Sequence, residues 1–380
     1  MQRIAEFLDG LVAAGKVPGC DCVVYRDHEQ VFRHMAGTSD FDRTVPVCEN
    51  DLYRCYSITK VMTATAAMQL VEQGLLDPLA PVSDYLPEYA HLTVKKDGKL
   101  VPAEEVLRVW HLFSMTGGMN YDFDAEEIQS CVRASGGLAN TRELVAAMAK
   151  MPLDFEPGER YQYSLCHDVL GAVIEVISGL TLEEYFQKHI IQPLGMKNTT
   201  MLPSGDELAH LAFLYDLDPE TKTLKPYDPR ILNDRLSPNY LAGGTGLYSC
   251  PGDYILLADA LACGGVGRNG ARILKEATVK RMQQNLLGAA QLRSFRTGEA
   301  AEGRFEPYGY GYGVRVRMIP SPAGCPVGEF GWSGAAGSYL LIDPINRLSF
   351  FYTMHVRRTR ASWEIAPVIQ ETIYKSLNGK

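Results

Sequence analysis

Strand-like segments lie near both ends of this chain, with helix-like segments between them, and this order restricts the folds open to it. Alternating apolar and polar residues predict strands over 20–25, 31–35, 308–318, 328–332, 338–343 and 348–355. Apolar residues at helical spacing predict helices over 2–14, 58–72, 253–263 and 363–377. Both termini are therefore expected to build one lobe, and the middle of the chain a second, mainly helical lobe.

The length of the chain supports two lobes. A single hydrophobic core usually stops growing at about 250–300 residues, and this chain has 380. Hydrophobic residues make up 46% and charged residues 22%, which is typical of a globular protein. We expect an α/β lobe from residues 1–60 together with 300–380, and the helical lobe from 61–299.

The charge and hydropathy patterns argue against two classes of partner. The net charge is −8 without a long block of either sign, whereas nucleic-acid binding requires a basic face. No run approaches the roughly 18 apolar residues of a membrane span. Glu6 and Asp9 interrupt the first apolar stretch, unlike a signal peptide. We expect a cytoplasmic protein with neither a nucleic-acid nor a membrane partner.

Cysteine and histidine spacing predicts neither a disulfide framework nor a metal site. The nine cysteines include no C-x-x-C pair, so reduced, mostly buried thiols are expected. The eight histidines show no H-x-x-x-H or H-E-x-x-H spacing. Residues 265–270 fit G-x-G-x-x-G but follow a helical segment, so they predict a loop. No metal and no cofactor are expected.

Ser57 and Lys60 form the first candidate catalytic pair. They lie three residues apart where a helix is predicted to begin, so their side chains share one face and can touch. Free N–H groups and the positive dipole end at this position favour an oxyanion. Lys60 can accept the Ser57 proton only in its uncharged form, which apolar surroundings favour. Alone, the S-x-x-K pair fits equally well with a serine N-cap followed by a solvated lysine.

Further motifs follow this pair, and together they resemble a known family. The matching segments are LYRCYSITK (52–60), GLLD (74–77), VSDYLP (82–87), HLFSMTGG (111–118), PGERYQYSL (157–165), QPLGM (192–196), GGTGL (243–247) and GWSG (331–334). Over nearly its whole length the chain resembles the serine β-lactamase and penicillin-binding-protein superfamily. The likeness is closest to family VIII carboxylesterases, and related to acyltransferases of the statin-pathway type. It implies a β-lactamase/transpeptidase-like α+β fold, with an antiparallel sheet flanked by helices, a mainly helical lobe and an active site between the two lobes.

The same resemblance implies roles for individual residues. Ser57 would be the nucleophile, Lys60 its proton acceptor and Tyr163 the group that protonates the leaving alcohol and then activates water. The backbone N–H groups of Ser57 and Ala335 would form the oxyanion hole. The residues expected to contact substrate are Trp332, Ser333, Gly334 and Leu165.

Two departures from the family pattern indicate the substrate. Leu165 stands where class C β-lactamases have an asparagine, and Trp332 where they have the lysine of K-T-G. Both changes remove polar groups that bind an anionic lactam and leave a more apolar cleft. We therefore expect a small-molecule ester or acyl substrate, and a carboxylesterase with weak or no β-lactamase activity.

Other activities stay open at this point. An acyltransferase or a D-aminopeptidase would use the same residues, and a non-catalytic relative that binds a ligand is a remote alternative. Tyr308, Tyr310 and Tyr312 either line the cleft or fill one sheet face. His167 is expected to be a core histidine or to tune Tyr163.

Overall fold

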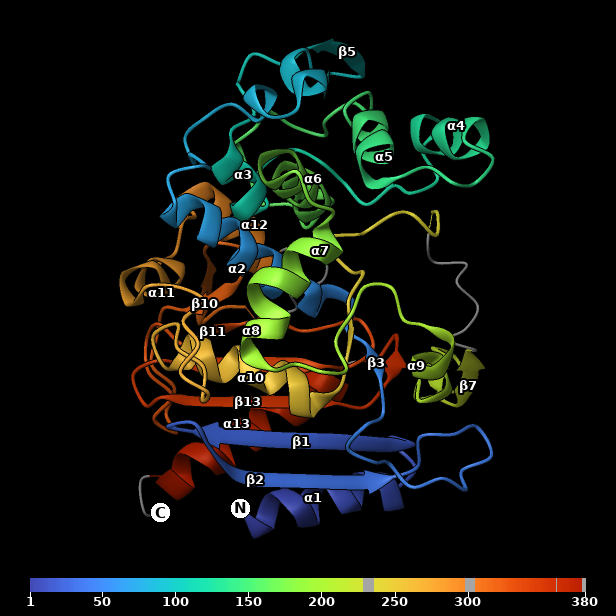
Figure 1. The fold of residues 1–380 in the computed structure, drawn as a ribbon, viewed down its shortest axis with the longest axis vertical. Helices are drawn as coiled ribbons and strands as arrows, with labels where there is room; N and C mark the ends of the chain where they lie inside the picture. The colour runs from blue at the N-terminus through green and yellow to red at the C-terminus, as the bar shows by residue number, and fades with distance from the viewer. Residues whose placement is uncertain (228–235, 298–304, 360, 378–380) are drawn as a thin grey trace.

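A seven-stranded antiparallel sheet is built from both ends of the chain, in the computed structural model that describes residues 1–227, 236–297, 305–359 and 361–377. The strand order is β2-β1-β13-β12-β11-β10-β9. Their bounds are β1 Gly19–Arg26, β2 Glu29–Gly37, β9 Tyr308–Tyr310, β10 Arg315–Arg317, β11 Phe330–Gly331, β12 Tyr339–Asp343 and β13 Leu348–Thr353. In Figure 1 the blue N-terminal strands lie beside the red C-terminal ones, which confirms the predicted fold class.

One predicted strand is in fact two. Residues 308–318 form β9 and β10, which pair with each other as a hairpin. Gly313, with φ +80°, turns the chain between them. Glycine adopts this left-handed conformation easily. The strand-forming tyrosines on the N-terminal side of this turn made the whole segment resemble one continuous strand.

Each face of the sheet packs against its own helices. The helices on the sheet are α1 Gln2–Ala13, α10 Pro251–Ala262 and α13 Ala361–Leu377. Cys20 and Cys22 of β1 point into a core that α1 and α13 cover, whereas Val23 points into the other core, which contains α10. Successive side chains of a strand alternate between faces, so Cys20 and Cys22 share one face of the sheet and Val23 lies on the other.

The middle of the chain is mainly helical, and most of its helices lie above the large sheet in Figure 1. Its helices are α2 Thr59–Glu72, α3 Val109–Ser114, α4 Glu126–Ala134, α5 Thr141–Met148, α6 Cys166–Ser178, α7 Leu182–Phe186, α8 Gln192–Leu194, α9 Gly205–Ala209, α11 Glu276–Met282 and α12 Ala289–Thr297. Small sheets join β3 Tyr53–Arg54 to β8 Tyr248–Ser249, β4 Thr93–Lys96 to β5 Lys99–Pro102, and β6 Leu214–Leu217 to β7 Leu224–Tyr227 and β14 Val356–Arg357.

The boundaries of the two predicted lobes stay a prediction. The helix α10 lies within the range 61–299 expected to be the helical lobe, yet it packs on the large sheet. Its Tyr254 ring stacks on Phe351 of β13, with centroids 5.4 Å apart. The predicted boundary between 299 and 300 lies outside the described residues.

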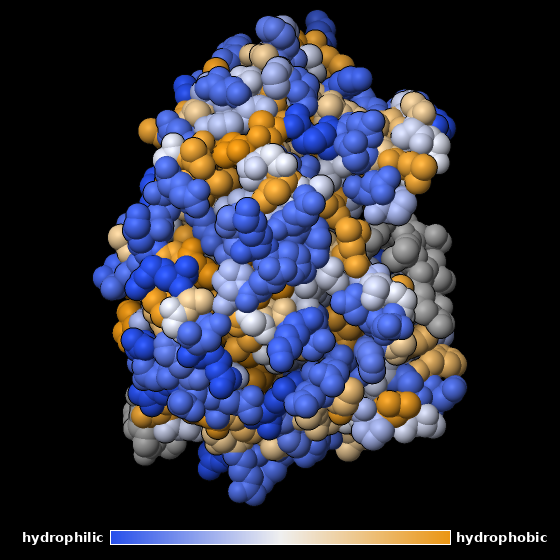
Figure 2. All heavy atoms as spheres, viewed as in Figure 1, coloured by the Kyte–Doolittle hydropathy of each residue, from blue (hydrophilic) through white to orange (hydrophobic). Residues whose placement is uncertain are grey.

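The surface has no large apolar face in the view of Figure 2, where apolar residues form small separate groups among hydrophilic ones. None of the helices that the structure describes is long and apolar enough to cross a membrane. All nine cysteines are free thiols and most are buried, as expected.

Candidate active site

The backbone around Ser57 is held in an unusual conformation. Tyr56, directly before it, has φ +47°, a left-handed conformation that few non-glycine residues adopt. The Cys55 N–H donates to the Leu247 carbonyl at 2.9 Å, and the Ile58 carbonyl accepts from a tyrosine hydroxyl of α10 at 2.6 Å. These contacts on both sides hold the turn. Ser57 is half-buried in a short 3₁₀ turn that leads into α2.

Lys60 lies in the first turn of α2, and its side chain is fully buried. Its Nζ donates to Ser57 Oγ at 3.3 Å, to the Tyr121 hydroxyl at 2.8 Å and to the Gly244 carbonyl at 2.9 Å. A lysine ammonium has three N–H donors and no acceptor. The structure therefore brings the predicted pair into contact and gives each ammonium donor a partner.

Tyr163 lies beside Lys60, with its ring instead of its hydroxyl facing the amine. Lys60 Nζ is 4.6 Å from the ring centroid, an attractive contact for a cation. The Tyr163 hydroxyl accepts the Nε1–H of Trp332 at 3.0 Å. The residues of two predicted motifs thus meet, and the role of Tyr163 as a proton handler stays a prediction.

Tyr121 is a site residue absent from the sequence predictions. Its hydroxyl bonds to Lys60, and its ring centroid lies 5.5 Å from that of Tyr163. Burial, together with neighbouring Tyr163, raises the pKa of Tyr121 well above the usual value of 10, so its phenol stays protonated. Tyr121 follows the HLFSMTGG loop by three residues, which is the signal that could have indicated it.

The third predicted motif lies against the chain that leads to Ser57. A side-chain carbon at Gly334 would be 2.5 Å from the Cys55 carbonyl oxygen, so only glycine fits there. This close approach brings the exposed Ala335 next to the nucleophile segment. Trp332 is 5% exposed, and Ser333 is half-buried and bridges to β12.

Aromatic rings surround Trp332 on several sides. The Phe305 ring is parallel to it at 5.9 Å, and Tyr310 meets it edge-on at 5.1 Å. Tyr310 therefore contacts a predicted site residue. Tyr308 instead accepts a hydrogen bond from Arg317 at 2.5 Å, and Tyr312 accepts one from Arg281 at 2.9 Å. All three tyrosines are buried, so they fill the interior.

The GGTGL segment, residues 243–247, passes between α2 and α6. Thr63 donates to the Gly243 carbonyl at 2.6 Å, and Thr59 accepts from the Leu247 N–H at 3.1 Å. A side-chain carbon at Gly243 would be 2.4 Å from the His167 carbonyl oxygen. Because of this tight fit, the segment can present the Gly244 carbonyl to Lys60.

Two small cavities lie near the site. Leu165 is 2% exposed and lines one of about 10 Å³ with methionines of the helical region. Its contact with substrate stays a prediction. The other, of about 40 Å³, lies beside Tyr56, and its wall includes Arg54, Phe123 and Tyr240.

His167 lies on α6 and is completely buried. Burial, and to a lesser degree the charge of Lys60, lowers the pKa of His167 well below 6.5, so the ring is neutral at neutral pH. A neutral, buried ring agrees with the expectation of a core histidine.

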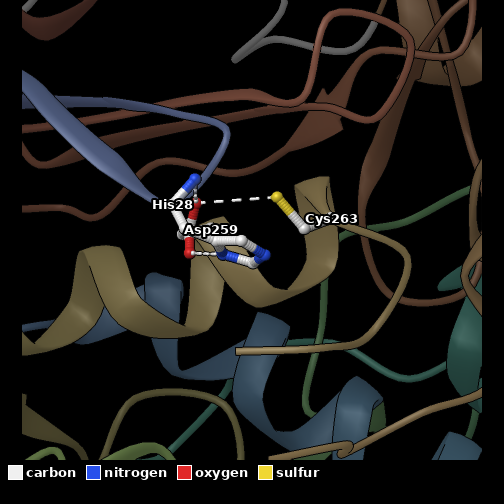
Figure 3. Close-up of side chains that lie close together, drawn as sticks. All are labelled: His28, Asp259 and Cys263. Atoms are coloured by element: carbon white, nitrogen blue, oxygen red, sulfur yellow. Dashed lines mark hydrogen bonds and ion pairs between the residues drawn. The ribbon is translucent and has the colours of Figure 1, made fainter. Parts of the chain in front are cut away.

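One cluster of potential metal ligands occurs among the described residues, at the turn between β1 and β2 (Figure 3). His28 Nδ1 lies 2.7 Å from Asp259 Oδ2, and the Cys263 thiol donates to Asp259 Oδ1 at 3.7 Å. The His28 N–H also donates to Oδ1 at 3.2 Å. These three donors satisfy the buried carboxylate, and burial raises the pKa of Cys263 to about 12, so the thiol is protonated. The cluster is explained without a metal.

Known proteins resemble this chain over nearly its whole length. The chain is 26% identical to Esterase EstB of Burkholderia gladioli over 393 residues, which cover 98% of this chain and 94% of the relative. Its fold matches a mutant of simvastatin synthase from Aspergillus terreus with a TM-score of 0.84, at 20% identity, over 100% and 98% of the two chains. It also matches EstCE1, described as a hydrolase with promiscuous acyltransferase activity, with a TM-score of 0.77, at 23% identity, over 98% of each chain.

The family profile described as Beta-lactamase matches residues 4–368, nearly the whole chain. The match spans the Ser57–Lys60 pair, the Tyr163 segment and the GWSG segment. Tyr163 connects them, because it contacts both the Lys60 amine and Trp332. Its relatives include an esterase and an acyltransferase. The protein therefore belongs to the beta-lactamase family, which comprises serine hydrolases and acyltransferases.

Proposed function

We propose that the protein is a carboxylesterase that works through an acyl-enzyme on Ser57. The observation that carries this proposal is the contact of half-buried Ser57 Oγ with the fully buried Nζ of Lys60, at 3.3 Å. This distance lets a proton pass from Oγ to an uncharged amine as the serine attacks.

The reaction proceeds in two steps. Oγ of Ser57 bonds to the ester carbonyl carbon, its proton passes to Lys60, and the C–O bond to the alcohol breaks as Tyr163 protonates the leaving oxygen. Water then attacks the acyl carbon and gives a proton to the Tyr163 phenolate, while the acyl–Oγ bond breaks and Lys60 returns its proton to Ser57 Oγ. The N–H groups of Ser57 and Ala335 are the proposed donors to the oxyanion, an interaction whose loss typically costs about 10²–10³ in rate.

The aromatic surroundings of Trp332 favour esters over lactams. A lysine at this position would offer a positive charge to a substrate carboxylate, whereas the Trp332 indole N–H already donates to Tyr163. Its ring is enclosed by Phe305 and Tyr310. An uncharged ester of small or medium size therefore suits these surroundings better than an anionic β-lactam. The similarity to Esterase EstB points the same way.

A direct assay tests the proposal. The wild-type enzyme is expected to hydrolyse p-nitrophenyl butyrate much faster than nitrocefin, and Ser57→Ala to lose the esterase activity. Ser130→Ala, at an exposed serine of α4, serves as the matched control. Full activity in Ser57→Ala would show that another residue is the nucleophile, and nitrocefin turnover equal to that of the ester would overturn the substrate assignment.

An acyltransferase is the second candidate. EstCE1, whose fold this chain shares, is described as a hydrolase with promiscuous acyltransferase activity. In that reaction an alcohol or amine replaces water as the attacking group. Products formed from p-nitrophenyl butyrate with and without added alcohols separate the two activities, because a transferase yields the new ester in excess of free butyrate. A D-alanine p-nitroanilide assay tests the D-aminopeptidase alternative in the same way.

A further inference from the structure

Asp168 is a buried carboxylate beside the site that has no part in the proposed reaction. It lies in the first turn of α6 and is 1% exposed. Oδ1 accepts the Tyr240 hydroxyl at 2.6 Å and the Gly244 N–H at 3.4 Å. Oδ2 is buried without a hydrogen-bond partner among the described residues. An unpaired carboxylate oxygen in the interior is costly unless a positive charge lies near it.

That positive charge lies on the other side of Gly244. A side-chain carbon at Gly244 would be 2.7 Å from Asp168 Oδ2 and 3.2 Å from Lys60 Nζ. Carboxylate and amine therefore enclose the same small space, which only glycine leaves open. Opposite charges this close in the interior favour each other's charged forms.

Three other titratable groups near Lys60, namely Cys166, Tyr121 and His167, carry no negative charge at neutral pH. Burial raises the pKa of Cys166 to about 11 and that of Tyr121 well above 10, and it lowers that of His167 well below 6.5. Tyr163 faces Nζ with its ring. Burial also raises the pKa of Asp168, but Lys60, the Tyr240 hydroxyl and the Gly244 N–H oppose that rise.

We propose that Asp168 is the counter-ion of Lys60, keeps its amine protonated in the resting enzyme, and thereby sets the pH above which Ser57 becomes reactive. The proposal rests on the proposed role of Lys60 as proton acceptor. The three hydrogen bonds from Nζ, to Ser57, Tyr121 and Gly244, are the full set that an ammonium can donate. The amine must first release one proton to solvent before it can take the proton of Ser57. Asp168 acts through Lys60, so it is a positioning residue.

The pH dependence of Ser57 labelling tests this role. A fluorophosphonate forms an Oγ–P bond and loses fluoride, and its rate of reaction is measured between pH 5 and 10. In Asp168→Asn the acid side of the profile is expected to move to lower pH by about one to two units. The plateau at high pH is expected to stay within a few-fold of wild type. A profile that does not move would overturn the proposal.

Asp253→Asn is the matched control. Asp253 is also a buried carboxylate in the first turn of a helix, and it bonds to Asn198 and Thr199 instead of facing Lys60. Its variant is expected to lose stability in the same way and to keep the wild-type profile. An equal shift in both variants would mean that the effect is structural.

A second measurement needs only the wild-type fold. The Nζ resonance of Lys60 in ¹⁵N-lysine-labelled protein, assigned by its loss in Lys60→Met, is expected at pH 7 to be that of an ammonium. A neutral amine at pH 7 would overturn the counter-ion role. If the fluorophosphonate does not label wild-type Ser57 at any pH, the proposed function fails instead, and the NMR measurement still tests the ion pair.

Discussion

Two fully buried cations, Lys60 and Arg315, are stabilised in different ways. Arg315 of β10 donates to Glu329 at 3.0 Å, to the Tyr339 hydroxyl at 2.7 Å and to a backbone carbonyl at 3.0 Å. Glu329 also accepts from Arg317 at 3.2 Å. Burial alone would lower the pKa of Arg315, but Tyr339 and Glu329 beside it raise that pKa above the usual value of a guanidinium, so its charge is permanent.

Lys60 makes its hydrogen bonds to uncharged groups, and its nearest carboxylate, Asp168, lies beyond Gly244. A directly paired guanidinium cannot release its proton, and it suits a permanent structural role. An amine that is bonded to a serine can, in its uncharged form, take up the proton of that serine. The distance to the counter-ion therefore distinguishes the two cations. Arg315 is paired directly and keeps its charge, whereas the amine of Lys60 can release a proton.

Lys60→Met is expected to have the largest effect on activity. Removal of the proposed proton acceptor is expected to lower kcat/KM for p-nitrophenyl butyrate on the order of 10⁴-fold or more. The stability loss should stay small, because Asp168 can take up a proton once the cation is gone. Lys95→Met, at a half-exposed pair with Asp154, is the control for both measurements. A large loss of stability with little loss of activity would contradict the catalytic role proposed for Lys60.

Glu329→Gln tests how much the ion pairs of Arg315 and Arg317 contribute to stability. It leaves the buried guanidinium groups of Arg315 and Arg317 without a negative partner, which is expected to lower the free energy of unfolding by about 3–5 kcal/mol. Chemical denaturation measures the loss. Glu276→Gln, at an exposed pair with Lys280, should change stability by less than about 1 kcal/mol. Equal effects of the two substitutions would contradict a structural role for the Glu329 cluster.

Two buried histidines that are neutral at pH 7 make the stability of the fold depend on pH. Burial lowers the pKa of His355 to about 3 and that of His111 to about 4. The unfolded chain binds these protons near pH 6.5, before the folded chain does. Stability is therefore full above pH 6.5 and falls as pH drops toward 4, by about 1.4 kcal/mol per pH unit for each histidine. Denaturation of His355→Phe at pH 7 and pH 5 checks this, since the variant should show a smaller difference between the two.

Trp332→Phe is expected to have the smallest effect. It keeps an aromatic ring and removes the N–H that donates to Tyr163, a hydrogen bond worth about 1 kcal/mol. The expected result is a loss of roughly fivefold in kcat for ester hydrolysis. A stability loss of about 1–2 kcal/mol is also expected, because the smaller ring leaves a gap in the buried aromatic cluster. Trp110→Phe, on α3, is the control. An unchanged kcat would indicate that Tyr163 does not need this hydrogen bond.

Much of the fold follows from short-range patterns in the sequence. The period-two alternation of β1 and the helical spacing of α2 reflect one-sided burial, which acts within a few residues. The same local geometry placed Ser57 and Lys60 in contact, because residues three apart share a helix face. The single strand predicted over 308–318 was wrong for a local reason, since glycine fits a strand and a turn alike.

The sequence by itself thus determined the order of the elements, the Ser57–Lys60 pair and the motifs that accompany it. Only the tertiary structure decided which groups complete the surroundings of Lys60. Tyr121 reaches Nζ from 61 positions away, and Gly244 from 184 positions away. Asp168 faces the amine because tight packing at Gly243 and Gly244 brings α2 and α6 together around one loop. Such contacts depend on the fit of distant segments, and no spacing along the chain encodes that fit.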